Sequence, residues 1–158
     1  MAPGVPFNRT QRIWWYMIPQ IAFLVALFYL FSTQDETFGM IYAIVVYYFI
    51  VYFLRGVIAY DHRKGVALLK SREYDGAIRT FQKSVDFFTR NSWIDKYRPI
   101  TLLSASKKCY REMGLCNIAF CYTQTQKGAE AKKLYEEILN EYPENDIAYS
   151  ALNTLRSV

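Results

Sequence analysis

Residues 13–31 read IWWYMIPQIAFLVALFYLF and residues 38–54 read FGMIYAIVVYYFIVYFL, two stretches without any Asp, Glu, Lys, Arg or His. A helix that crosses a bilayer needs about 20 mainly apolar residues, with a range of roughly 17–25. Both stretches reach that range, and only STQDET at residues 32–37 separates them. We therefore expect a transmembrane helical hairpin over residues 13–60, with spans at 13–31 and 38–57, after a tail of residues 1–12.

Two other interpretations of these stretches are open. A hairpin buried in a soluble core would normally keep a polar stripe toward water, and neither stretch has a continuous one. A cleaved signal peptide has an apolar core of about 7–15 residues followed by small residues at the cleavage site. The first stretch is longer and ends in the bulky residues Tyr29, Leu30 and Phe31. Trp14, Trp15 and Tyr16, at its other end, are residue types that settle at headgroup depth. These features favour a retained membrane anchor.

Charged residues around the hairpin predict its orientation. The turn between the stretches holds only the acidic residues Asp35 and Glu36, whereas basic residues flank both outer ends: Arg9, Arg12, Arg55, Arg63 and Lys64. Lys and Arg accumulate on the cytoplasmic side of membrane proteins. We therefore expect an integral membrane protein with both termini in the cytoplasm, with Arg55 extending its side chain to the headgroups.

Charge is spread unevenly along the rest of the chain, which has a net charge of +5. Residues 61–111 hold twelve Lys and Arg against five Asp and Glu, and residues 112–158 hold four against seven. A basic segment beside a bilayer attracts anionic lipid by about 1 kcal/mol per nearby cation, although an ordinary solvated helix face explains the same composition. No nucleic-acid recognition motif accompanies these bases, so we expect no nucleic-acid partner.

Residues suited to catalysis or metal binding are scarce. The cysteines Cys109, Cys116 and Cys121 are odd in number, which argues against a disulfide framework in a cytoplasmic domain. They form no C-x-x-C pair and lie far from His62, the single histidine. The sequence also has no Gly-rich phosphate loop and no G-x-S-x-G motif. We expect buried free thiols, no catalytic residue, no cofactor or metal site, and a protein that is not an enzyme.

Two segments of the C-terminal part match one another: KGVALLKSREYDGAIRTFQKS at residues 64–84 and LCNIAFCYTQTQKGAEAKKLYEEILNEYPEN at residues 115–145. Both resemble the tetratricopeptide repeat, a helix-turn-helix unit of 34 residues. The positions that agree with the repeat pattern are Gly65, Leu68, Ala77, Phe81 and Ser84 in the first segment and Leu115, Ile118, Ala119, Tyr122, Ala131, Tyr135, Ile138 and Pro143 in the second. Ile138 stands where the pattern usually has a small residue. An ordinary amphipathic α-hairpin shares the spacing of three and four residues.

The repeat pattern has a physical cause. Ala77 and Ala131 would lie where two helices come closest, and Phe81 and Tyr135, four residues on, would enter the seam between them. Pro143 would end a helix, and Asn145 or Asp146 could cap a last helix at residues 146–157. The resemblance therefore implies an all-α array over residues 61–158, with about two repeats and a capping helix.

The array has an insertion between its two units. Ala77 and Ala131 are 54 positions apart, about 20 more than one repeat length. Pro99 suits the first turn of a helix, so we expect one long helix from there to Gln124, with Lys107, Lys108 and Arg111 as a solvated stripe. Extra turns of this region could rest on the first unit, or on the membrane through Trp93, Ile94 and Tyr97. We also expect the second span to pass straight into the first unit.

Repeats of this kind usually bind peptides or protein helices in a concave groove. By resemblance, the groove-lining residues are His62, Val66, Leu69, Lys70, Cys116, Phe120, Thr123 and Gln124. Tyr48, Tyr52 and Arg55 share a stripe of the second span that could dock another membrane helix. The function we expect is a membrane-anchored scaffold for protein partners. The alternative is an accessory subunit of a transporter or membrane enzyme, held through its hairpin, and self-association stays open.

Overall fold

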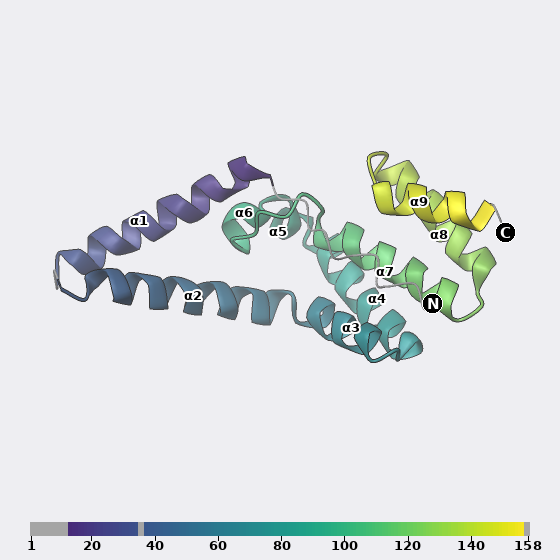
Figure 1. Ribbon diagram of the computed structural model, residues 1–158, viewed down its shortest axis with the longest axis horizontal. Coiled ribbons are helices and arrows are strands. Elements are labelled where there is room, and N and C mark those ends of the chain that lie inside the picture. Colours follow the sequence, from purple (N-terminus) through teal and green to yellow (C-terminus); the bar gives the residue numbers. More distant parts are fainter. Residues whose placement is uncertain (1–12, 35–36, 157–158) are drawn as a thin grey trace.

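The computed structural model describes residues 13–34 and 37–156, which form helices and connecting loops without a strand (Figure 1). The predicted all-α fold is therefore confirmed. In chain order the helices are η1 (Trp14–Met17), α1 (Ile18–Ser32), α2 (Gly39–Ile58), α3 (Tyr60–Lys70), α4 (Tyr74–Arg90), α5 (Ser92–Lys96), α6 (Arg98–Thr101), α7 (Tyr110–Gln124), α8 (Gly128–Glu141) and α9 (Asp146–Arg156). The predicted tail with Arg9 and Arg12, the turn residues Asp35 and Glu36, and the end of the last helix at residue 157 lie outside the described residues.

The helices α1 and α2 form a hairpin that projects from the rest of the protein (Figure 1). Trp14–Ser32 and Gly39–Ile58 are long and apolar enough to cross a membrane. They meet closely at the turn, where a Cβ atom on Gly39 would lie 2.8 Å from the backbone of Ser32. No side chain of α1 is buried, and α2 buries only Gly39 and Ala43. The hairpin therefore presents its apolar side chains outward.

A single residue, Ala59, separates α2 from α3. Its side chain is almost completely buried in a small apolar cluster with Phe88, Ile94 and Leu102. The second apolar helix thus continues into the first helical unit with one residue between them, as expected from the repeat register.

Two helical pairs, α3 with α4 and α7 with α8, form the array, and α4 packs against α7. The side chains of Ala77, Phe81 and Ala131 are completely buried and that of Tyr135 nearly so, as the repeat spacing predicts. Gly65 permits the close approach of α3 to α4, because a Cβ atom there would lie 2.8 Å from the Phe81 ring. The helix α9 packs against α8 and α7.

The prediction of one long helix from Pro99 to Gln124 is wrong. Pro99 does lie in the first turn of a helix, but α6 has only four residues, and a loop at residues 102–109 precedes α7. Asp95 stabilises the start of α7, since its two carboxylate oxygens accept hydrogen bonds of 2.9 Å from the backbone N–H groups of Tyr110 and Arg111. A carboxylate at the first turn of a helix also interacts favourably with the helix dipole. A capping box between Cys109 and Glu112 completes the new start.

Arginine side chains fix the loop at residues 102–109. The buried guanidinium of Arg98 donates to the carbonyl oxygens of Ser106, Asp95 and Lys107 over 3.1, 2.9 and 2.6 Å. Arg55, from α2, donates to the carbonyl oxygens of Leu102, over 3.0 Å, and of Leu103. The donors of Arg55, which we expected at the headgroups, are thus taken up by backbone acceptors of the loop.

Each residue of the basic trio of the insertion has an acidic partner, and only Lys107 is exposed. Arg111 bonds to Glu141 and Lys108 to Asp146, while Lys107 lies 3.5 Å from Glu144. The acidic distal half of the array thus supplies partners for the basic proximal half. For Lys108 and Arg111, this pairing corrects the prediction of a solvated stripe.

Candidate functional site

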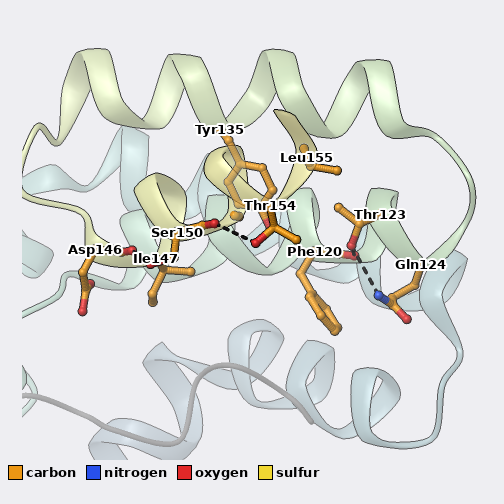
Figure 2. Close-up of a pocket in the computed structure, with 10 residues that line it drawn as sticks. Phe120, Thr123, Gln124, Tyr135, Asp146, Ile147, Ser150, Thr154 and Leu155 are labelled. Atoms are coloured by element: carbon orange, nitrogen blue, oxygen red, sulfur yellow. Dashed lines mark hydrogen bonds between the residues drawn. The ribbon is translucent and has the colours of Figure 1, made fainter. Parts of the chain in front are cut away.

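A pocket of about 520 Å³ lies between α7 and α9, with one wall from α8 (Figure 2). The residues that line it are Phe120, Thr123, Gln124, Tyr135, Asp146, Ile147, Ser150, Ala151, Thr154 and Leu155. Its apolar surface comes mainly from two aromatic rings and the aliphatic side chains of α9. Such a composition suits a hydrophobic side chain of a bound segment.

The start of α9 is positioned by Asn145. Its side-chain oxygen accepts a hydrogen bond of 2.8 Å from the backbone N–H of Ala148 and so caps the helix. Ala148 and Leu152 are buried against α8 and α7. The register set by this cap places Ile147, Ser150 and Thr154 along the pocket (Figure 2).

Polar groups at the pocket are hydroxyls, an amide and one carboxylate. The Thr123 hydroxyl donates to the Phe120 carbonyl over 2.7 Å and accepts from the Gln124 amide over 3.4 Å. On the facing helix, Ser150 and Thr154 donate to the carbonyls of Asp146 and Ser150 over 2.8 and 3.0 Å. The helices' own carbonyls thus hold these hydroxyl protons, while the exposed Ser150 hydroxyl oxygen can still accept a hydrogen bond from a ligand.

Titratable groups near the pocket have pKa values that suit binding rather than proton transfer. Burial raises the pKa of Tyr135, so its phenol stays protonated. The hydrogen bond from Lys108 lowers the pKa of Asp146, so its carboxylate is charged and already paired. Burial raises the pKa of Cys116 and of Cys121 to about 12. These thiols are therefore protonated at neutral pH and are poor nucleophiles.

The residues predicted to line a groove do not form one surface. Phe120, Thr123 and Gln124 come together in the pocket. The remaining five lie elsewhere: His62, Leu69 and Cys116 are buried, Val66 is half-buried and Lys70 is exposed. The buried three are covered by neighbouring helices in this structure and do not line an open groove.

His62 is enclosed by aromatic rings. Its imidazole lies 5.5 Å from the Phe81 ring and 5.1 Å from the Tyr110 ring, centroid to centroid, with the rings edge to face. Burial lowers the pKa of His62 to about 4. The side chain is therefore a neutral part of the core.

The predicted stripe of α2 is divided. Tyr48 and Tyr52 are 66% and 69% exposed, whereas Arg55 is half-buried and bonded to the loop after α6. The Arg63 guanidinium, from α3, lies 5.5 Å from the centre of the Tyr52 ring. The two tyrosines thus form an outward surface without Arg55.

The contribution of α9 to the pocket was not predicted from the sequence. The repeat length gives the missing signal, because adding 34 to positions 116 and 120 reaches Ser150 and Thr154. The second of these pairs, Phe120 and Thr154, lines the pocket from its two sides. Ser150 and Thr154 of α9 thus lie one repeat length after Cys116 and Phe120 of α7.

Comparison with known families agrees with this geometry. The model of the family described as Tetratricopeptide repeat matches residues 115–145. Comparison with curated proteins and with solved structures gives no match. The matched stretch includes most of α7, all of α8 and Asn145, the cap of α9. The chain therefore contains a tetratricopeptide repeat, and α7 and α8 are its two helices.

Proposed function

We propose that this protein is a membrane-anchored scaffold whose pocket between α7 and α9 receives a hydrophobic side chain of a protein partner. The supporting observation is the pocket itself, which combines apolar side chains with hydroxyl groups. It lies between the two helices of the tetratricopeptide repeat and α9. Units of this family serve in protein–protein interaction, so the pocket is a recruitment site rather than an active site.

The exposed surface of the hairpin supports the membrane anchor. A helix from a soluble core would be mostly buried, whereas the 18-residue windows of Trp14–Ser32 and Gly39–Ile58 are 0% and 6% buried. Fully burying one large apolar side chain is worth roughly 1.5–3 kcal/mol. A bilayer provides this burial for both helices. The basic residues beyond each outer end favour the cytoplasm for the array.

A pair of substitutions on α9 tests the pocket. Ser150 is exposed and lines the pocket, so Ser150→Arg would fill it with little effect on folding. Asn153, exposed on the same helix outside the pocket, gives the control Asn153→Arg. A photo-crosslinking residue at each position identifies the partner in intact cells. We expect a specific adduct from position 150 and none from 153, and we expect Ser150→Arg to abolish co-purification of that partner.

Equal crosslinking from both positions, or co-purification unaffected by Ser150→Arg, would contradict the pocket as the recruitment site. Solvent accessibility tests the anchor separately. Thr33→Cys, at the turn, and Lys64→Cys, on α3, introduce exposed thiols at opposite ends of α2. An impermeant maleimide applied outside the cell membrane should label Thr33→Cys, and label Lys64→Cys only after permeabilisation. Native thiols give little background because burial raises their pKa values.

A second function is favoured by Tyr48 and Tyr52. Two largely exposed hydroxyl-bearing rings on one face of α2 could pack against a helix of a transporter or membrane enzyme. In that case the protein is an accessory subunit held through its hairpin. Replacing both tyrosines by Leu would then release the partner, whereas Ser150→Arg would not. Retention after the double replacement argues against this alternative.

A further inference from the structure

The short helices α5 and α6 carry an outward aromatic patch. Trp93, Tyr97 and Ile100 are 58%, 52% and 65% exposed. They follow one another at intervals of four and three residues, while Ile94 and Arg98 on the other side are buried. Helical turns connect them, since Tyr97 N–H donates to the Trp93 carbonyl and Ile100 N–H to the Tyr97 carbonyl, each over 2.9 Å. The insertion thus presents three large side chains to the surroundings.

The segment beside this patch is bonded to both arms of the hairpin, where the first arm begins and the second ends. Arg55, in the last turn of α2, bonds to the carbonyls of Leu102 and Leu103. At the start of the other apolar helix, the backbone N–H of Ile13 donates to the Ala105 carbonyl over 3.0 Å. The helices α5 and α6 therefore lie at the open end of the hairpin, opposite its turn (Figure 1).

A further contact joins α6 to η1, at the start of the hairpin. The Arg98 guanidinium lies 5.5 Å from the centre of the Tyr16 ring. Next to it, Trp14 and Trp15 stack with ring centroids 3.8 Å apart and remain exposed. Trp and Tyr are enriched at the boundary between hydrocarbon and water. The aromatic residues of η1 and of α5–α6 thus occur at one height along the hairpin.

We propose that α5 and α6 rest in the headgroup region of the membrane that the hairpin spans, with the side chains of Trp93, Tyr97 and Ile100 inserted among the lipids. This inference depends on the proposed insertion of the hairpin. It extends that proposal from an anchor with a domain above the bilayer to a domain that itself touches the bilayer. The occupant of the patch is a phospholipid interface.

Three features favour lipid over a protein partner. The patch is continuous with a hairpin that needs an apolar environment. Two of its three residues, Trp93 and Tyr97, are of types that prefer interfaces. The exposed ammonium of Lys96 lies 5.6 Å from the centre of the Tyr97 ring, where it can also reach a phosphate. Three side chains are also far fewer than the roughly 20–30 residues a side of a stable protein interface.

The distribution of tryptophan makes a direct test simple, because the chain has only three: Trp14, Trp15 and Trp93. The variant Trp14→Phe/Trp15→Phe reports on α5 alone, and Trp93→Phe reports on the hairpin alone. Each full-length protein is reconstituted into phosphatidylcholine–phosphatidylglycerol vesicles that carry bromine either near the headgroup or deep in the acyl chains. Bromine quenches tryptophan emission only at close range. We expect Trp93 emission to fall in the shallow-brominated vesicles and to fall less in the deep-brominated ones.

The two proposals fail differently in this experiment. Quenching of Trp14 and Trp15 without quenching of Trp93 overturns the interfacial contact and leaves the anchor intact. Absence of quenching in both variants overturns both. A charge within the patch gives a second measurement, since Ile100→Asp should reduce the quenching of Trp93, whereas Tyr149→Asp, exposed on α9, should not. Equal quenching with Ile100→Asp and with the parent also overturns the inference.

Discussion

The side-chain nitrogen of Asn145 donates a hydrogen bond of 2.8 Å to Oε1 of Glu112, deep between the starts of α9 and α7. Each residue caps its own helix as well. Glu112 accepts from the backbone N–H of Cys109 over 3.3 Å, and Asn145 accepts from that of Ala148. One pair of side chains therefore sets the relative position of the two helices that line the pocket.

Replacement of Asn145 by Ala should destabilise the array. The change removes a helix cap, worth about 1 kcal/mol, and takes the amide donor from Oε1 of the buried Glu112, worth about 1–3 kcal/mol. We expect a loss of about 2–4 kcal/mol in the free energy of unfolding, measured by denaturation of the full chain in detergent. The control is Asn153→Ala, because Asn153 is exposed on α9. A loss below that of the control would contradict the bridging role.

Two glycines should respond to alanine in opposite directions. A Cβ atom at Gly65 would lie 2.8 Å from the fully buried Phe81 ring, whereas one at Gly128 meets nothing within 4 Å. Overpacking lowers the free energy of unfolding by about 1–3 kcal/mol, whereas the higher helix propensity of alanine raises it by up to about 1 kcal/mol. We expect Gly65→Ala to lower the melting temperature and Gly128→Ala to raise it slightly. Phe81→Leu should lower the free energy of unfolding by less in the Gly65→Ala variant than in the wild type. A double-mutant cycle measures this difference.

Acid should weaken the fold through His62. Its pKa is about 4 in the folded protein and 6.5 in the unfolded chain, so only the unfolded state binds this proton between those values. The free energy of unfolding should therefore stay level above pH 6.5 and fall by about 3 kcal/mol on acidification to pH 4. Thermal denaturation followed by circular dichroism over this range measures the effect.

His62→Phe is the matched control for this pH dependence. Phenylalanine keeps an aromatic ring between Phe81 and Tyr110 and removes Nδ1, which finds no hydrogen-bond partner among the described residues. Glu112, whose pKa burial raises, titrates equally in both proteins. The difference in stability between wild type and variant should thus change between pH 6.5 and 4. A constant difference would show that another group controls the response.

Arg98→Lys should loosen the loop at residues 102–109. An ammonium cannot reproduce the planar fork that reaches three carbonyl oxygens, and each hydrogen bond to a charged group is worth about 1.5–3 kcal/mol. We expect faster hydrogen exchange in residues 102–109. The control Arg90→Lys changes an exposed side chain with one long hydrogen bond of 3.3 Å to Asp86. Similar exchange in both variants would contradict the role of Arg98.

Local patterns were sufficient to predict the hairpin and both repeat units. The apolar runs and the small residues Ala77 and Ala131 act through neighbours in the same helical pair, so their effect is visible in a short window. The insertion was mispredicted because its structure depends on Arg55, Asp95 and Arg98, which act on backbone groups up to 48 positions away. Pro99 correctly indicated a helix start, but nothing local indicated that the helix stops after one turn.

The lining of the proposed pocket could be predicted only in part. Phe120, Thr123 and Gln124, which line it, belong to the leading helix of a recognisable repeat. His62 and Cys116 were assigned to the groove by the same rule, yet Tyr110 packs against the first and Asn145 against the second. Both covering residues come from helix starts whose position depends on long-range capping. The exposure of a groove position therefore follows from the packing of adjacent units as well as from repeat register.

Ala59 is the only residue between α2 and α3. Close to it, the Arg55 side chain of α2 bonds to the loop after α6. A scaffold on a flexible tether sweeps a large volume and meets partners in any orientation. Here the array has no such freedom. With the hairpin spanning a bilayer as proposed, a captured partner would be held at one distance from the lipid and in one orientation. The protein would therefore select partners by geometry as well as by sequence.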